Sequence, residues 1–312
     1  MTMSGGPAHA PVADSTGNWV DRSAPLWAVP YLRLMRADRP IGSWLLLLPC
    51  WWATALGAIA ANAPGPDLYL LILFGIGAVI MRGAGCTWND IIDREVDAKV
   101  ARTRSRPIPS GQVTVKQALI FAIALSLIGF VILLQFNAYA IGTGIASLIV
   151  VALYPFAKRV TNWPQLVLGL AFSWGALMGW AAVFGSLDLP AFVLYAGSIL
   201  WVIGYDTIYA HQDREDDMAI GVRSTARLFG VETRTALLIL YGGAVALITL
   251  AIELTGGGMI ALLGVLGFAL HLVWQIRTLD VNDPARCLMQ FRSNRDAGLI
   301  LFAGLAFDSM VF

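Results

Sequence analysis

Charged residues are scarce in this chain of 312 residues, because Asp, Glu, Lys and Arg together make up only 13% of it. A soluble domain usually carries charge on about a quarter of its residues. Hydrophobic residues make up 58% of the sequence, and the mean hydropathy is +0.70. The composition therefore excludes an ordinary water-soluble protein and indicates an integral membrane domain. The formal net charge of +1 gives no indication of a nucleic-acid partner.

Cysteine and histidine are also few, with three of each. The cysteines stand singly, without a CxxC pair, which indicates small apolar packing residues and argues against a disulfide framework or a zinc site. The histidines are equally dispersed, so the sequence does not predict a histidine metal cluster.

The beginning of the chain lacks the apolar segment that a secretory signal needs. Residues 1–25 are rich in Gly, Ala, Pro and Ser, which predicts a disordered tail ahead of one transmembrane domain over residues 26–312. An Arg-rich, acid-poor leader of the transit type is also missing. That absence favours a multi-pass protein of a bacterial inner (cytoplasmic) membrane over a mitochondrial one.

Long apolar runs, in contrast, are abundant. A hydrocarbon core about 30 Å thick needs roughly 20 apolar residues in a helix. This criterion predicts an all-α integral membrane fold with about nine transmembrane helices. The expected spans are 41–61, 68–88, 115–135, 138–155, 164–184, 189–209, 236–255, 257–277 and 297–312.

Basic residues lie on one side of these spans. The chain has 21 Lys and Arg residues. All except Arg82 lie before the first span or in and beside the connections that follow the second, fourth, sixth and eighth spans, with Lys116 and Arg277 at the adjoining ends of their spans. Because basic residues mark the cytoplasmic side, the N-terminus is expected inside and the C-terminus outside. Spans two and six then both run toward the cytoplasm and end in long loops rich in Asp and Arg, which suggests a parallel repeat.

The first of these loops begins with the segment CTWNDIIDREVD. Asn89, Asp93 and Asp97 are spaced four apart, so a helix that continues out of the membrane places them on one face, with Asp90 beside them. Carboxylates near a bilayer cost about 3 kcal/mol each toward the helix centre, and like charges on one face repel. Mg²⁺ prefers oxygen ligands and combines one or two carboxylates with substrate phosphates. The motif therefore predicts a site for a diphosphate bound through Mg²⁺.

The second loop repeats the pattern in the segment YDTIYAHQDREDD. Asp213 and Asp217 are four apart, and Asp206 lies two turns earlier on the same face. A solvated loop explains one such motif as well as a metal site does, but two motifs at equivalent ends of equivalent spans favour the metal site. The basic residues expected to bind diphosphate oxygens, the arginines bidentately, are Lys99, Arg102, Arg106 and Arg223.

At these motifs the chain resembles the UbiA superfamily of membrane prenyltransferases. The family pattern of Asn-Asp, with further Asp residues three and seven positions after the first Asp, occurs within 89–97, and its second pattern within 213–217. The resemblance extends over nearly the whole chain from about Arg33. Segments similar to the branch that prenylates 4-hydroxybenzoate are 35–49, 81–97, 106–111, 154–165 and 204–230.

This resemblance implies a Mg²⁺-dependent enzyme that transfers a polyprenyl chain from polyprenyl diphosphate to 4-hydroxybenzoate, ortho to the phenol, in ubiquinone biosynthesis. It implies a fold of nine helices around a central cavity that opens laterally to lipid. Asp90 and Asp206 are expected to be catalytic, with Asp206 either accepting the ring proton or binding metal through water. The expected metal ligands are Asn89, Asp93, Asp97, Asp213 and Asp217.

A cation should bind the carboxylate of such an acceptor. Arg82 lies well inside a span, where an arginine usually pairs or faces a cavity, although a diphosphate contact or an ion pair with a motif Asp is the competing role. Arg36 is the other main candidate, against simple snorkelling to the interface. Lys158 and Arg159 are further candidates, against an ordinary positive-inside role.

Two alternatives remain open from the sequence. One keeps the enzyme class and changes the acceptor to homogentisate, dihydroxynaphthoate or haem. The other is a cation-coupled transporter, since repeats and intramembrane Asp residues also suit transport. Against transport, the carboxylates lie at the expected cytoplasmic ends of the spans and not at the midplane.

Overall fold

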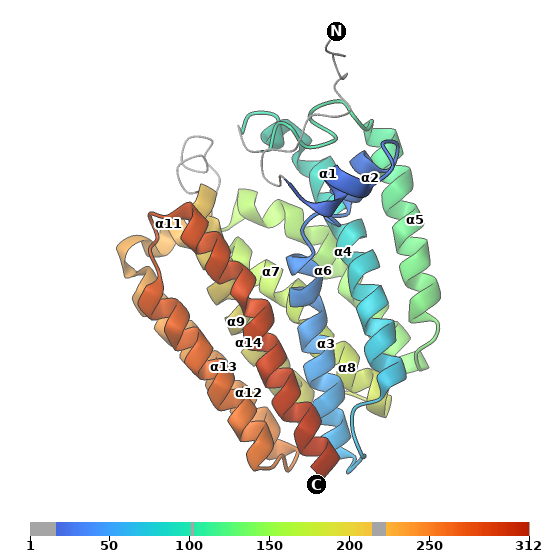
Figure 1. Cartoon of the computed structure of the whole chain (residues 1–312). Helices are drawn as coiled ribbons and strands as arrows, with labels where there is room; N and C mark the ends of the chain where they lie inside the picture. Colours follow the sequence, from blue (N-terminus) through green and yellow to red (C-terminus); the bar gives the residue numbers. More distant parts are fainter. Residues whose placement is uncertain (1–16, 101–102, 214–222, 312) are drawn as a thin grey trace. The chain divides into compact units, whose positions relative to one another are not determined.

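The structure is a computed structural model that describes residues 17–100, 103–213 and 223–311 (Figure 1). Within those ranges all regular structure is helical. The chain divides into two compact units, described separately below. The first unit comprises residues 1–43 and 76–135, and the second comprises residues 44–75 and 136–312.

Eight helices of the described residues are long and apolar enough to cross a membrane, and they coincide with the first eight expected spans. The expectation of a multi-helical membrane domain is thereby confirmed for those eight. The helices concerned are α3 (Ile41–Ala60), α4 (Leu68–Asp97), α5 (Val115–Leu133), α6 (Ala138–Val160), α7 with α8 (Pro164–Ser173 and Gly175–Phe184), α9 (Leu189–Ala210), α12 (Thr233–Leu254, preceded by α11, Thr225–Phe229) and α13 (Met259–Thr278).

The ninth expected span, 297–312, falls in the second half of α14 (Pro284–Val311). This helix does not meet the same criterion of length and apolarity, because Arg295, Asp296 and Asp308 interrupt its apolar stretch. The remaining helices of the described part are short: α1 (Trp19–Ser23), α2 (Val29–Leu34), η2 (His211–Asp213) and η3 (Gly230–Glu232).

Helix α1 lies inside the segment for which composition predicted a disordered tail. The Asn18 side chain caps it by accepting hydrogen bonds from the backbone of Val20 and Asp21. Val20 is fully buried, and Asp21 pairs with Arg33 at 3.0 Å. A helix cap and an ion pair to a residue twelve positions away order this segment, and composition does not register either. Residues 1–16 lie outside the described ranges.

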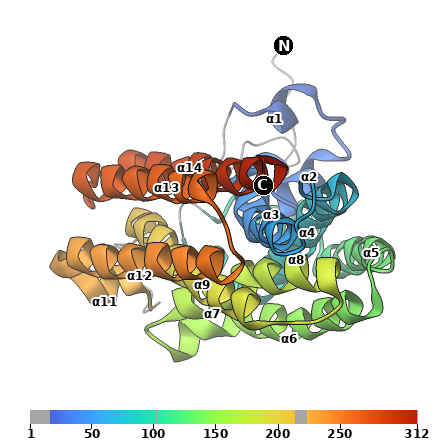
Figure 2. The ribbon, with the colours of Figure 1, turned by 90° about the horizontal axis from the view of Figure 1, so that it is seen from below.

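In the second unit, α9 packs against α7, α8, α12 and α14, and α13 packs against α14 (Figures 1 and 2). Helices α13 and α14 approach each other at Gly264 and Gly304. A Cβ added to Gly304 would lie 2.5 Å from the Cα of Gly264. Small residues at membrane helix interfaces permit this close backbone contact, which gains dispersion energy where lipid offers no hydrophobic driving force.

Buried aromatic residues form the centre of the second unit. The rings of Trp52, Trp201 and Phe268 contact one another at centroid distances of 4.8 to 6.0 Å. Both indole N–H groups are satisfied, because Trp52 donates to the Gly298 carbonyl at 2.8 Å and Trp201 donates to the Asn294 side chain at 2.9 Å. A buried tryptophan contributes most when its N–H finds such a partner.

The expected span 164–184 consists of two helices, because the helix is interrupted at Trp174 between α7 and α8. The Trp174 indole N–H donates to the Thr143 carbonyl at 3.0 Å. Immediately after the break, a Cβ on Gly175 would lie 2.6 Å from the Cys50 sulfur, so α8 approaches α3 very closely there. Hydropathy alone does not reveal this interruption, because both α7 and α8 are apolar.

Helix α13 begins at a position that cannot cap itself, because Gly258 has no side chain. Asp308 of α14 supplies the cap, accepting from the Gly258 N–H at 2.7 Å and the Ala261 N–H at 3.1 Å. The Asp308 side chain is 1% exposed. A carboxylate at a helix N-terminus satisfies otherwise orphaned N–H groups and interacts favourably with the helix dipole.

We expect Asp308→Ala to lower the free energy of unfolding by about 1–3 kcal/mol, because the buried N–H of Ala261 and the partly buried N–H of Gly258 lose their acceptor. Asp308→Asn should cost less, since the amide retains one acceptor oxygen. Ser309→Ala is the matched control, because that hydroxyl bonds only within its own helix, to Ala306 at 2.9 Å. Unfolding midpoints in detergent test this, and an equal loss in Ser309→Ala would contradict the capping role.

Candidate functional site

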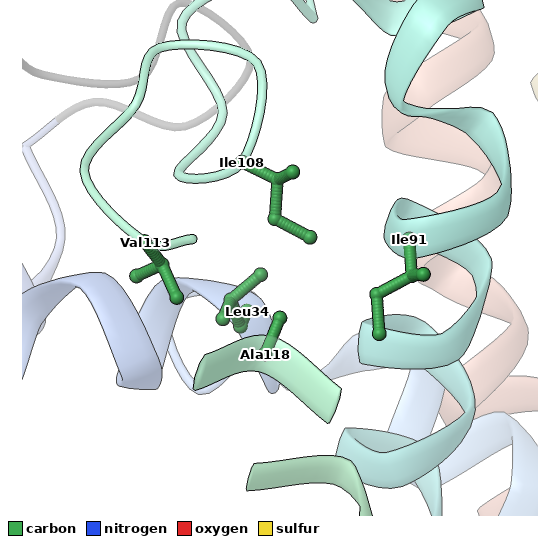
Figure 3. Packing of buried hydrophobic residues seen from close by; sticks show 5 residues of the cluster. All are labelled: Leu34, Ile91, Ile108, Val113 and Ala118. Carbon is green, nitrogen blue, oxygen red and sulfur yellow. The ribbon is translucent and has the colours of Figure 1, made fainter. Parts of the chain in front are cut away.

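A small apolar cluster organises the first unit. It consists of Leu34 at the end of α2, Ile91 on α4, Ile108 and Val113 in the connection that follows, and Ala118 on α5 (Figure 3). All five are at most 8% exposed. The cluster brings three separate segments together, and each carries a charged residue within two positions of a cluster member. These neighbours are Arg36, Asp90 and Arg106.

Helix α4 continues through Asp97, which confirms the expected extension beyond the span. Its last turns carry the first acidic motif. Asp90 and Asp93 are fully buried and Asp97 is 6% exposed, while Asn89 is partly buried. The Thr103 hydroxyl donates to the Asp97 carbonyl at 2.9 Å and so satisfies one of the last carbonyls of the helix.

Two arginines lie against these carboxylates. The Arg36 guanidinium pairs with the Oδ1 of Asp90 at 2.7 Å. Arg106 pairs with the Oδ2 of Asp97 at 3.0 Å and approaches the same Asp90 oxygen at 3.4 Å. Buried carboxylates need such partners, because an uncompensated charge in a low-dielectric environment is very costly. The structure thus places Arg36 and Arg106, expected at the acceptor and at the diphosphate, on the acidic motif itself.

The motif suits a metal that is completed by substrate. The Oδ2 of Asp90 is buried and has no hydrogen-bond partner among the residues that the structure describes, so it can accept a ligand. Among the described residues, no three His, Cys, Asp or Glu side chains lie together as a ready-made metal cage. Mg²⁺ does not require such a cage, because it commonly keeps water ligands and binds substrate phosphates. The donor set of the first motif therefore fits Mg²⁺ better than zinc.

The backbone at Arg36 is strained. Its φ is +61°, in the left-handed region that non-glycine residues rarely adopt. The residue occupies the position after the C-cap of α2, where the Ala37 N–H reaches back to the Leu32 carbonyl at 2.9 Å, and glycine is usual there. An arginine at such a position indicates that its side chain offsets the backbone cost, here through the ion pair with Asp90.

Arg82 is partly buried on α4, about two helical turns before Asn89, and its guanidinium lies against Gly42 at the start of α3. The next residue, Gly83, meets the end of α2, because a Cβ there would lie 2.8 Å from the Cβ of Met35. The sequence singled out Arg82 but neither glycine, and a glycine in an apolar span carries no signal by itself. Asp38 was also missed, although it is 7% exposed with a buried, unpartnered Oδ1.

The second acidic motif lies in the second unit. Asp206 is partly buried near the end of α9, and η2 closes at Asp213. The Asp213 side chain and the whole of Asp217 lie outside the described residues.

Two buried hydrogen bonds tie the start of α11 to neighbouring helices. The hydroxyls of Thr207 and Thr225 are 2.6 Å apart, and the Thr225 N–H donates to the Gln165 side chain at 3.0 Å. The first bond connects α11, which follows the segment 214–222 in the sequence, to α9, which precedes that segment. The second bond connects α11 to α7.

The other expected basic residues are less informative. The Arg223 guanidinium donates to the Val160 carbonyl at 2.8 Å, where a cation interacts favourably with the end of α6. Lys99 is exposed just after α4. Arg102 is outside the described residues, as are the side chains of Lys158 and Arg159. Their expected roles at the diphosphate and the acceptor stay predictions.

We expect Arg36→Gly to be more stable than Arg36→Ala by about 1 kcal/mol, because glycine adopts positive φ without a Cβ clash. Both variants should be less stable than the unaltered chain, by roughly 3 kcal/mol for the exchange to alanine, since each removes a partner of the buried Asp90. Asn62 provides a matched control, with φ of +51° at the end of α3. Asn62→Gly should cause no loss. If Arg36→Gly unfolds like the unaltered chain, the ion pair does not stabilise this turn.

Comparison with known proteins identifies the family of the chain. The UbiA prenyltransferase family matches residues 46–300. The 4-hydroxybenzoate polyprenyltransferase, mitochondrial, of Bos taurus is 46% identical over 311 residues, which span 98% of this chain and 82% of that protein. The protein of the same name from Drosophila melanogaster is 48% identical, over 91% of this chain and 72% of its own.

Solved structures show the same fold. A UbiA homolog from Aeropyrum pernix K1 is similar with a TM-score of 0.70 and 29% identity, over 85% of this chain and 97% of that one. A UbiA homolog from Archaeoglobus fulgidus bound to GPP and Mg²⁺ has a TM-score of 0.61, over 91% of this chain and all of that one. At 18% identity this second likeness supports the fold alone. From its acidic motif, its helical fold and these relatives, the chain belongs to the UbiA prenyltransferase family.

Proposed function

We propose that this chain is a 4-hydroxybenzoate polyprenyltransferase of ubiquinone biosynthesis, embedded in the membrane by several helices. The observation that carries the proposal is the 46% identity, over 98% of the chain, to a protein of that activity. The substrates are then a polyprenyl diphosphate and 4-hydroxybenzoate. The relatives are named mitochondrial, so the bacterial inner membrane expected from the sequence stays a prediction, as does the orientation of the termini.

The acidic motifs are proposed to bind Mg²⁺ together with the diphosphate. Asn89, Asp93 and Asp97 contribute from α4, and Asp213 and Asp217 contribute from the second motif. When bound, Mg²⁺ neutralises the negative charge that develops on the diphosphate as it leaves. The burial of the Asp93 and Asp97 carboxylates at the end of α4 supports this assignment, and the UbiA homolog from Archaeoglobus fulgidus is itself described as bound to GPP and Mg²⁺.

The basic residues are proposed to bind the diphosphate once it arrives. Arg106 now neutralises Asp97 and Asp90, and a metal bound to the motif would release its guanidinium for phosphate oxygens. Lys99, Arg102 and Arg223 are assigned the same role on their charge and position in the two loops. Arg36 then remains as the permanent partner of Asp90, since its turn is built around that contact.

The reaction breaks the bond between the allylic carbon and the diphosphate oxygen, and the bonding electrons leave with the diphosphate. The ring carbon ortho to the phenol attacks the allylic carbon, and the ring proton then passes to a base. We assign this base to Asp206, which is partly buried on α9, with a water-mediated metal contact as its alternative role. Asp90 is assigned an electrostatic part, because its buried carboxylate forms an ion pair with the Arg36 guanidinium at the end of α4.

Arg82 is proposed to bind the acceptor carboxylate. It lies on the helix of the first motif, about two turns before Asn89, so it can hold the ring near the reacting end of the prenyl chain. An arginine binds a carboxylate with two parallel hydrogen bonds, which fixes orientation as well as distance.

The transporter alternative has less support. None of the relatives reported above is named a transporter, and the carboxylates at the end of α4 suit the binding of a phosphate through a metal ion.

We expect Asp93→Asn to abolish Mg²⁺-dependent transfer while membrane insertion is retained, because a neutral amide binds a divalent cation poorly. Asp217→Asn should act in the same way. Glu95→Gln is the matched control, since Glu95 lies on the same helix and its side chain is 80% exposed. Pyrophosphate release from membranes supplied with both substrates provides the measurement. Near-full activity of both Asp variants would contradict the metal assignment.

Arg82→Ala should raise the KM for 4-hydroxybenzoate by about tenfold or more, since it removes a charge-assisted pair worth about 1.5–3 kcal/mol. The KM for the prenyl diphosphate should change little. Steady-state kinetics with each substrate varied in turn tests this. An unchanged KM for the aromatic acid in Arg82→Ala would contradict the role of Arg82, and an unchanged KM in the Arg36 variant as well would leave neither residue as the partner of its carboxylate.

A further inference from the structure

The first turn of α3 has no side chain at Gly42, and the Arg82 guanidinium occupies the space. A Cβ added to Gly42 would lie 2.5 Å from the Nε of Arg82, 2.9 Å from its Nη2 and 3.0 Å from its Cζ. Real Cβ atoms essentially never approach other heavy atoms below 3.0 Å. Three guanidinium atoms at such distances place this group directly against the glycine.

The dipole of α3 does not favour this contact. The N-terminal end of a helix carries partial positive charge, so it repels a cation. Gly42 therefore does not attract the guanidinium electrostatically, and its contribution is the space that a side chain would otherwise fill. Both residues belong to the first unit, so their contact is defined within one compact body.

The neighbouring Gly83 shows what a different kind of close contact involves. A Cβ at Gly83 would lie 2.8 Å from the Cβ and 3.5 Å from the Cα of Met35, so a substitution there must displace the backbone end of α2. At Gly42 the colliding atoms are the far end of a flexible side chain. A methyl group at Gly42 can therefore be accommodated by moving the Arg82 guanidinium, with the helices left in place.

We propose that Gly42 is a positioning residue that determines where the Arg82 guanidinium lies and thereby how tightly the aromatic acid binds. The inference rests on the proposed function, in which Arg82 binds the acceptor carboxylate. With glycine, the guanidinium lies against the backbone of α3. A larger residue at position 42 displaces the guanidinium from α3, so that it no longer lies where it can form hydrogen bonds to the carboxylate of the aromatic acid.

The test is Gly42→Ala in the full chain, assayed in membranes with both substrates varied. We expect the KM for 4-hydroxybenzoate to rise about tenfold, because a displaced guanidinium loses a charge-assisted hydrogen bond to the carboxylate, with kcat changed less than about twofold. The KM for the prenyl diphosphate should stay the same. Gly75→Ala is the matched control on α4, because a Cβ there meets nothing within 4 Å. It should leave all three constants unchanged.

The variant should fold, because alanine is more favourable than glycine in a helix, and an unchanged unfolding midpoint in detergent checks this. A double-variant cycle with Arg82→Ala separates positioning from general damage. Gly42→Ala should cause no further loss of kcat/KM for the acid once the guanidinium is gone, because the two changes act on one contact.

Several outcomes overturn the inference. These are an unchanged KM for the acid in Gly42→Ala, an equal rise in both KM values, or a full loss in the Arg82→Ala background. If Arg82→Ala raises that KM and Gly42→Ala does not, the role of Gly42 is wrong and the role of Arg82 stands. If Arg82→Ala has no effect on that KM, the assignment of Arg82 is wrong and that of Gly42 falls with it. Absence of any transfer by the unaltered chain contradicts the proposed function itself.

Discussion

The pairing of buried carboxylates with guanidinium groups is the constraint on which the first unit depends. Asp90, Asp93 and Asp97 lie on the last turns of one helix with almost no exposure, and isolated charges in such a place are prohibitively costly. Arg36 and Arg106 supply the opposite charge from two other segments. The apolar cluster beneath them brings those segments together, and the strained turn at Arg36 persists because the ion pair stabilises it. The same paired residues thus stabilise the fold of this unit and provide the charges that can bind a charged ligand.

Much of the fold could be predicted from the sequence, because a membrane restricts the possible structures to a few. Backbone polar groups must be satisfied within each span, so an apolar run of about 20 residues is nearly always a helix. Eight spans were found on this basis, and α4 extends through Asp97 as its spacing predicted. The family was predicted from a resemblance carried by the acidic motifs, and the family match over residues 46–300 confirms it. The side chains of Asp213 and Asp217 lie outside the described residues, so their role stays a prediction.

The remainder depended on contacts between distant residues, which a single sequence does not display. The pairing of Arg36 with Asp90 and of Arg106 with Asp97 could not be read from the sequence, and the substrate roles expected of these two arginines stay predictions. The interruption at Trp174 coincides with close packing of Gly175 against α3 and a hydrogen bond from Trp174 to α6, and hydropathy reports neither contact. Gly42 is one of 31 glycines, and only the three-dimensional structure shows which neighbour occupies the place of its side chain.

The close crossing of α13 and α14 has a consequence for motion within the second unit. Backbone touches backbone at Gly264 and Gly304, and buried amides of Gln275 and Gln290 bond each helix to the other at 3.3 and 3.0 Å. Neither helix can slide or tilt relative to the other without breaking several of these contacts at once, so we expect α13 and α14 to move as one rigid body. If helices of this unit separate to admit a bulky hydrocarbon chain, we expect that separation between its other helices.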